Sequence, residues 1–166
     1  VLGVRQHAFL GSASARTEGL PSRRHTDSGM AWGTPQLAGP GADAGPDSLT
    51  AAAVAEAASD LAAYAVRFAP DLLVSYQADG GYGHPDHVAC HRIAAEAARR
   101  TGVRFAEVLS HPPEGPSPLD RYLDLVTEAL RCYRSQLTID GDEVLHVGGQ
   151  RHPIPTAVAL QRGSDV

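Results

Sequence analysis

The sequence predicts an α/β fold with a largely parallel sheet. Segments with the apolar, β-branched character of strands alternate with segments whose apolar residues fall at helical spacing. The clearest strand, 71–76, reads "DLLVSY" and is nearly continuously apolar, which is typical of a strand buried on both faces of a parallel sheet. Ligands bind such sheets at the carboxyl ends of the strands, so the residues after Tyr76 are where we first expect a site.

The N-terminal part combines one predicted strand with a long loop. Residues 4–11, "VRQHAFLG", are apolar and β-branched enough for a short strand that ends at Gly11. Residues 11–48 are rich in Gly, Pro, Ser and Thr. A loop of this length in a compact domain is usually a functional lid or a disordered insert, and we expect it to be ordered in part.

A helix is predicted between this loop and the strand 71–76. Asp47 or Ser48 can cap it, its apolar residues recur at helical spacing through 49–69, and Pro70 closes it. The many alanines predict an amphipathic helix that packs closely against its neighbours.

The second half of the chain continues the alternation. A helix is expected to start at Pro85, which the first turn tolerates, and to stop at Gly102. The remaining predicted elements are a strand at 103–110, a helix at 119–136 and two short strands at 143–147 and 156–161.

Composition limits the class of protein and its partners. The 166 residues are 43% hydrophobic, enough to bury a core, and we expect residues 1–166 to form one domain. The formal net charge of -5 argues against a nucleic-acid or anionic-membrane surface and favours small polar partners; the oligomeric state stays open. Two cysteines, Cys90 and Cys132, predict a reducing, cytoplasmic setting, and no apolar stretch is long enough to span a bilayer.

The stretch "DGGYGHPDHVACH", 79–91, gathers three histidines, two aspartates and a tyrosine after the strand. Imidazole and carboxylate are usual zinc ligands, and a turn leading into a helix can present His84, Asp86 and His87 around one point. His91 lies one helical turn beyond His87 and could share its face. The structural alternative is that His84 caps the helix and Asp86 interacts with its dipole. His87 and His91 would then hydrogen-bond to nearby backbone. The density of these groups at a strand end favours a functional site.

The segments "FLG", "DSGMAWGTP", "APDLLVSYQADGGYGHPDHVACHR" and "YRSQL" occur in an order that resembles the PIG-L/LmbE-like zinc de-N-acetylases. The resemblance is strongest to the branch that acts in mycothiol biosynthesis and removes acetate from N-acetylglucosaminyl-inositol. It implies a Rossmann-like, mostly parallel sheet with flanking helices, a small amino-sugar substrate, and Zn²⁺ or another divalent metal as cofactor. The related mycothiol-conjugate amidases tend to carry proline in place of Gly83, which favours the deacetylase.

The resemblance also implies roles for five residues. His87 would be a metal ligand, and His84 would stabilise the oxyanion or protonate the leaving amine. Asp86 would orient or tune its neighbours, and Tyr82 would polarise the acetyl carbonyl with its phenol. Asp27 would bind sugar hydroxyls, although an Asp-Ser-Gly sequence is equally typical of an ordinary turn.

The family's first signature, His-Pro-Asp-Asp-Glu, is missing from the sequence. The other His-Pro pairs, at His111 and His152, are not followed by paired acids. Because that signature supplies further metal ligands and the general base, we expect this chain alone to be an incompetent deacetylase. The resemblance thus predicts an N-terminally incomplete domain without the opening strand-helix-strand unit. The alternative is a non-catalytic remnant that still binds sugar.

Overall fold

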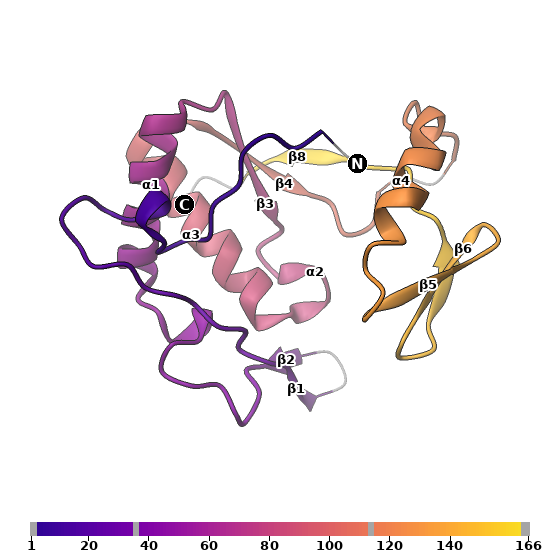
Figure 1. Cartoon of the computed structure of the whole chain (residues 1–166), viewed down its shortest axis with the longest axis horizontal. Helices are drawn as coiled ribbons and strands as arrows, with labels where there is room; N and C mark the ends of the chain where they lie inside the picture. Colours follow the sequence, from indigo (N-terminus) through magenta and orange to yellow (C-terminus); the bar gives the residue numbers. More distant parts are fainter. Residues whose placement is uncertain (1–2, 35–36, 113–114, 164–166) are drawn as a thin grey trace. The chain divides into compact units, whose positions relative to one another are not determined.

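The computed structural model describes residues 3–34, 37–112 and 115–163, which fall into two compact units (Figure 1). The larger unit comprises Ala8–Ser110 and the strand at Leu160–Arg162. The smaller unit comprises His111–Ala159 and the residues before Ala8. The division into two units leaves the expectation of a single domain as a prediction.

The larger unit contains a three-stranded mixed sheet. β3 (Leu72–Tyr76) and β4 (Arg104–Val108) are parallel, and β8 (Leu160–Arg162) is antiparallel to β4, in the order β3-β4-β8. α3 (Pro85–Thr101) connects the two parallel strands and packs on β3 (Figure 1). The mixed α/β class is therefore confirmed, with small sheets and flanking helices.

α1 (Val54–Phe68) packs against α3 over a core of small side chains. Ala57, Ala58 and Ala97 are fully buried and surround Ile93, because alanine lets the two helix backbones approach closely. The helix starts later than predicted, since the 3-10 turn η2 (Leu49–Ala51) comes first. Its N-cap is Ala53, which provides no side-chain cap bond, so the predicted capping of this helix by Asp47 or Ser48 is wrong.

The predicted strand at 4–11 is also wrong. These residues form no strand, and Val4 and Phe9 are 76% and 79% exposed. An apolar segment becomes a strand only where a sheet edge pairs with its backbone, and none of the strand ladders in the described part of the chain includes residues 4–11. The long loop contains the short helix η1 (Ala13–Ala15) and the small antiparallel pair β1 (Ala31–Thr34) and β2 (Leu37–Gly39).

The strand β3 is not buried on both faces, contrary to the prediction. Its outer side chains Leu72, Val74 and Tyr76 are 36%, 47% and 42% exposed, while the alternate residues are half-buried. Successive strand residues point to opposite faces, and α3 covers one of them. An apolar run thus predicted the strand correctly but not its surroundings.

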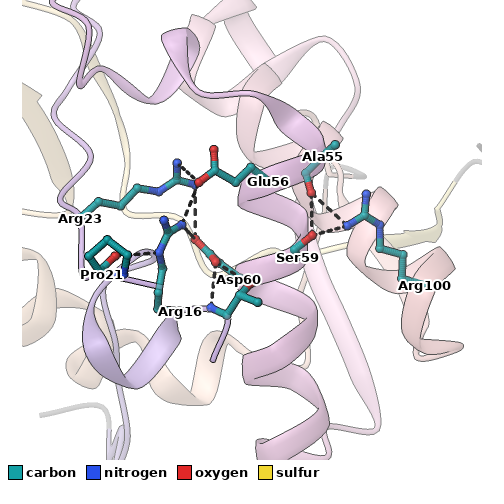
Figure 2. Close-up of polar contacts among 9 residues, drawn as sticks. Arg16, Pro21, Arg23, Ala55, Glu56, Ser59, Asp60 and Arg100 are labelled. Atoms are coloured by element: carbon teal, nitrogen blue, oxygen red, sulfur yellow. Dashed lines mark hydrogen bonds and ion pairs between the residues drawn. The ribbon is translucent and has the colours of Figure 1, made fainter. Parts of the chain in front are cut away.

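A buried polar cluster joins the loop to α1 (Figure 2). Asp60 is fully buried, and its Oδ1 accepts hydrogen bonds from the backbone and hydroxyl of Thr17. Its Oδ2 accepts from Arg16 at 2.7 Å and from Arg23 at 3.3 Å, and Glu56 pairs with both arginines. Burial alone would raise the pKa of Asp60, but these hydrogen bonds outweigh it and hold that pKa below its ordinary value.

The smaller unit consists of one helical segment and one antiparallel sheet. The predicted helix at 119–136 is shorter than expected, because the chain turns at Arg131–Gln136 after Leu130. The strand predicted at 143–147 is confirmed, whereas its two neighbours were not predicted. The elements are η3 (Asp120–Tyr122), α4 (Leu123–Leu130), β5 (Leu137–Asp140), β6 (Glu143–His146) and β7 (Arg151–Pro153), with sheet order β5-β6-β7.

Across residues 3–34, 37–112 and 115–163, the helices are too short or too polar to cross a bilayer.

Candidate functional site

A glycine-rich turn, α2 (Gly80–Gly83), carries the chain from the end of β3 into α3. Asp79 caps it by accepting a hydrogen bond from the Gly81 amide at 2.9 Å. Gly80 has φ +71°, and a Cβ there would lie 2.9 Å from Val88 Cγ2, so only glycine fits. Gly83 also has a positive φ, of +82°. These backbone angles turn the chain so that Tyr82 and His84 lie beside the first turn of α3, which carries His87.

His87 is held in the tautomer that a metal ligand needs. Its Nδ1 lies 3.1 Å from the carbonyl oxygen of Gly80, and because a carbonyl only accepts, Nδ1 carries the proton. The lone pair of the neutral ring is therefore on Nε2. Burial lowers the pKa of His87, outweighing the opposing effect of the bond to Gly80, and keeps the ring neutral.

His84 has the opposite tautomer. Its Nδ1 accepts a hydrogen bond from the Asp86 amide at 3.2 Å, which caps α3. The neutral ring consequently carries its proton on Nε2, where it can donate. The capping role considered for His84 is thus confirmed, and it leaves a hydrogen-bond donor on the other side of the ring.

Four rings form a cluster at the end of β3. The His84 and His87 rings are stacked with centroids 4.6 Å apart, and the Tyr82 ring meets both edge-on, at 5.9 and 5.4 Å. Tyr76 stacks on His87 at 3.9 Å and fixes the plane of that ring. Tyr82 is 57% exposed, so its phenol remains accessible to a ligand.

Asp86 connects this cluster to the loop residues 27–29. Its Oδ2 accepts from the Ser28 amide at 3.0 Å, while its Oδ1 is buried without a hydrogen-bond partner among the described residues. Ser28 is itself buried and accepts two hydrogen bonds from Thr50. Asp27 makes a local turn, because its Oδ1 accepts from the Gly29 amide at 2.6 Å. Asp27 is therefore adjacent to the Asp86 contact but does not make it.

His91 does not belong to the ring cluster. It is 6% exposed, and its Nδ1 donates to the Tyr76 carbonyl at 3.0 Å. The same nitrogen lies 3.7 Å from a carboxylate oxygen of Glu107, which is also buried. One helical turn separates His91 from His87, but α3 presents it to the sheet, where it acts as a buried structural histidine.

The family resemblance implies a divalent metal, and the side chains of the site can be checked for their ability to bind it. In the described part of the chain, no group of three His, Cys, Asp or Glu side chains is placed to hold an ion. The prepared Nε2 of His87 fits a divalent cation as one ligand of a larger set. Cys90 does not add to the set, because burial raises the pKa of its thiol and keeps it protonated.

A cavity of about 730 Å³ adjoins the turn. Its walls include Tyr82 and Asp79 from the turn, Arg92 from α3 and Thr50 from η2, but neither His84 nor His87. Sequence reasoning missed Arg92 and Thr50. Helical periodicity from Val88 would have placed Arg92 on the same face of α3, whereas Thr50 has no local signal.

A strand end that presents two imidazoles of opposite tautomer beside an exposed phenol places hydrogen-bond donors and an acceptor side by side, as sites of proton transfer do. The chain belongs to the PIG-L family, described as GlcNAc-PI de-N-acetylase, whose profile matches residues 1–98.

Several curated relatives carry the name 1D-myo-inositol 2-acetamido-2-deoxy-alpha-D-glucopyranoside deacetylase. The relative from Nocardiopsis dassonvillei is 44% identical over 62% of this chain and 31% of its own length. Those from Kribbella flavida and Saccharomonospora viridis are each 29% identical, over 84% and 98% of this chain and over 60% and 68% of their own lengths. The chain thus spans less than two thirds of the first two relatives.

Proposed function

We propose that this chain carries part of the active site of a metal-dependent N-deacetylase. Its substrate would be an N-acetylglucosaminyl-inositol conjugate of mycothiol biosynthesis, and its products acetate and the free amine. The family and the names of the relatives support this reaction. The observation that carries the proposal is the bond from His87 to the Gly80 carbonyl, which leaves Nε2 ready for a cation beside His84 and Tyr82.

His87 would hold the ion, Zn²⁺ or another divalent metal, at Nε2. When bound, such an ion supplies Lewis-acid polarisation of the amide carbonyl. The remaining ligands and the general base would come from a His-Pro-Asp-Asp-Glu segment that these 166 residues do not contain. Two of the relatives contain residues beyond the matched part, which is 31% and 60% of their lengths.

Two further side chains would act on the acetyl group. The Tyr82 phenol is exposed and edge-on to both histidines, so it can donate a hydrogen bond to an oxygen that gains negative charge. The proton on Nε2 of His84 can be donated to the same oxygen or to the departing amine. Asp86 would position the turn at Ser28, and exposed Asp27 would bind sugar hydroxyls.

The sugar would occupy the cavity beside Tyr82. Asp79, Arg92 and Thr50 place acceptors and donors on its walls, which suits a ring bearing several hydroxyl groups. Apolar side chains such as Val88 and Ile93 also line the cavity and can contact the face of the ring.

We propose three further properties that the contacts of the site do not bear on. They are a Rossmann-like sheet completed by an opening strand-helix-strand unit, one N-terminally incomplete domain over residues 1–166, and a cytoplasmic setting. The parallel β3-α3-β4 unit supports the first of these.

One alternative is a remnant that binds sugar without catalysis, which the lack of a three-ligand group among the described residues favours. A mycothiol-conjugate amidase is less consistent with the turn. Gly83 has φ +82°, whereas proline is fixed near -65°, so the proline of that branch would reshape the segment before His84.

The test uses the 166-residue chain and a version extended with the N-terminal stretch of the Nocardiopsis dassonvillei relative. Release of acetate from N-acetylglucosaminyl-inositol is measured with added Zn²⁺. We expect the extended protein to be active, its His87→Gln variant to lose activity by about 100-fold or more, and the chain alone to be inactive. A folded, extended protein without activity, but with metal-independent binding of the substrate by calorimetry, would support the remnant instead.

A further inference from the structure

A second pair of histidines lies in the smaller unit, on neighbouring strands of the antiparallel sheet. The Nε2 atoms of His146 on β6 and His152 on β7 are 2.9 Å apart. The register pairs Val144 with His152, so His146 is the diagonal neighbour of His152 on the same face. His152 is exposed and His146 is partly exposed, so solvent and solutes reach the pair.

The two strands hold the imidazoles in place. The ladder pairs Glu143 with Pro153 and Leu145 with Arg151. A tight turn closes it, with a bond from the Gly149 amide to the His146 carbonyl at 2.8 Å and one from the His146 amide to the Gln150 carbonyl at 2.9 Å. The histidine backbones are therefore fixed on both sides of the turn, and only the side-chain torsions remain to adjust.

Hydrogen bonding selects the free nitrogen of His152. Its Nδ1 lies 2.8 Å from the Pro153 carbonyl oxygen and must donate to it, which leaves the lone pair on Nε2. A backbone carbonyl that holds the far nitrogen of a histidine is the arrangement that orients metal-binding imidazoles. The Nε2 of His146 donates to that lone pair, and it becomes a second ligand when its proton moves to its own Nδ1.

The separation of the two nitrogens fits a tetragonal ion. Two bonds of about 2.05 Å at a right angle separate their nitrogens by about 2.9 Å, whereas a tetrahedral angle requires about 3.3 Å. Square-planar or tetragonal nitrogen coordination is typical of Cu²⁺ and Ni²⁺. The observed 2.9 Å is the length of the hydrogen bond between the two rings. Once the proton has moved and the rings turn to aim both lone pairs at an ion, the same separation matches two adjacent positions of a tetragonal ion.

Arg151, the neighbour of His152 in the chain, lies on the other face of the sheet. Arg151 pairs with Glu143 at 2.9 Å and with Asp140 at 2.8 Å, and these three residues alternate with the histidine face. Its guanidinium is thereby compensated by two carboxylates and does not oppose a cation at the imidazoles.

We propose that His146 and His152 form a two-imidazole binding site for a tetragonal transition-metal ion, Cu²⁺ or Ni²⁺, on the β6-β7 hairpin. No third His, Cys, Asp or Glu completes the group within the described ranges, so water fills the other positions. The site lies within the smaller unit and does not depend on the proposed deacetylase function.

The test is a Cu²⁺ titration of the 166-residue chain followed by electron paramagnetic resonance. We expect a site with two equatorial nitrogens, which differs from any ion held at His87 because it persists when His84 and His87 are replaced. Either His146→Gln or His152→Gln should weaken Cu²⁺ binding at least about tenfold and reduce the nitrogen count. The matched control His111→Gln, at an exposed histidine of the same unit, and the double variant His84→Gln/His87→Gln should keep the site.

Unchanged Cu²⁺ binding in both single variants would overturn the proposal and leave an ordinary hydrogen bond between two histidines. Loss in only one of them would also overturn it, because the ion would then use a single imidazole. A measurement without substitutions guards against misfolding of the variants: bound Cu²⁺ should broaden the amide resonances of Val144, Leu145 and Arg151 in the unmodified chain. Sharp resonances at all three would contradict the site.

Discussion

Asp60 and Asp86 are two largely enclosed carboxylates of the larger unit that are used in different ways. One oxygen of Asp60 accepts hydrogen bonds from Thr17. The other accepts from Arg16 and Arg23, as Figure 2 shows. Asp86 accepts one bond, from Ser28, and its Oδ1 has no partner among the described residues. A carboxylate with both oxygens hydrogen-bonded holds the fold together. Asp86, with one oxygen unbonded and near His84 and His87 in the chain, retains the capacity to act on another group.

The largest expected effect concerns stability at Asp60. Asp60→Asn removes the charge that faces the buried Arg16 and should lower the free energy of unfolding by about 2 to 3 kcal/mol. The loss is less than that of an isolated buried pair because Glu56 still contacts both arginines. Urea unfolding followed by circular dichroism measures it. A change below about 0.5 kcal/mol would mean that the cluster does not stabilise the fold.

The turn at Gly80 should show the next largest effect. Gly80→Ala combines a positive φ with a Cβ 2.9 Å from Val88, and should cost about 2 kcal/mol. Gly102→Ala is the matched control, because Gly102 has φ +72° and open space around it, so it should cost about 1 kcal/mol. Equal costs in the same unfolding assay would show that Val88 yields to the new methyl group.

The pH dependence of stability should show the contribution of the ionised Asp60 carboxylate. Because the folded pKa of Asp60 lies below its ordinary value of 3.8, its contribution is present above that value and is lost as pH falls through the folded pKa. Hydrogen bonds from Arg99 and Arg100 lower the pKa of Glu96 to about 2, so Glu96 adds to the same acid limb. The free energy of unfolding, measured from pH 5 downward, should depend less on pH in Asp60→Asn than in the unmodified chain. An identical pH dependence in both proteins would contradict the lowered pKa of Asp60.

Asp86→Asn should have the smallest effect on stability. The amide oxygen can still accept from the Ser28 backbone, so we expect a change within about 0.5 kcal/mol. In the extended protein the same variant should nevertheless lower the rate of acetate release, because the orientation of the turn changes with the charge. If stability falls as much as for Asp60→Asn, the contrast between the two carboxylates does not hold.

The elements that the sequence predicts correctly are those whose start or end is marked by residues of the element itself. Pro85 and Gly102 delimit α3, and the apolar run 71–76 marks β3, so both are confirmed. The strands β5 and β7 are only three or four residues long and depend on pairing with β6, so no local pattern indicates them. The segment 4–11 shows the converse, because it forms no strand, and Val4 and Phe9 remain exposed although they are apolar.

The candidate site likewise has parts that the sequence predicts and parts that depend on the folded chain. The glycines predict a turn that gathers Tyr82, His84 and His87, and the structure brings these rings together. The tautomers of the two imidazoles depend on single hydrogen bonds of the folded turn. The contact between Asp86 and Ser28 joins residues 58 positions apart, which no local pattern encodes.

The coordination of a cation by His87 is the central claim, and its imidazole nitrogen resonances test it most directly. Zn²⁺ is titrated into the 166-residue chain labelled with ¹⁵N-histidine, with His87→Gln used to assign the signals. We expect the Nε2 resonance of His87 to shift to the position of a metal-bound nitrogen while the proton on Nδ1 stays in its bond to Gly80. An Nε2 resonance that does not move at saturating Zn²⁺, or a proton found on Nε2 instead of Nδ1, would contradict the account.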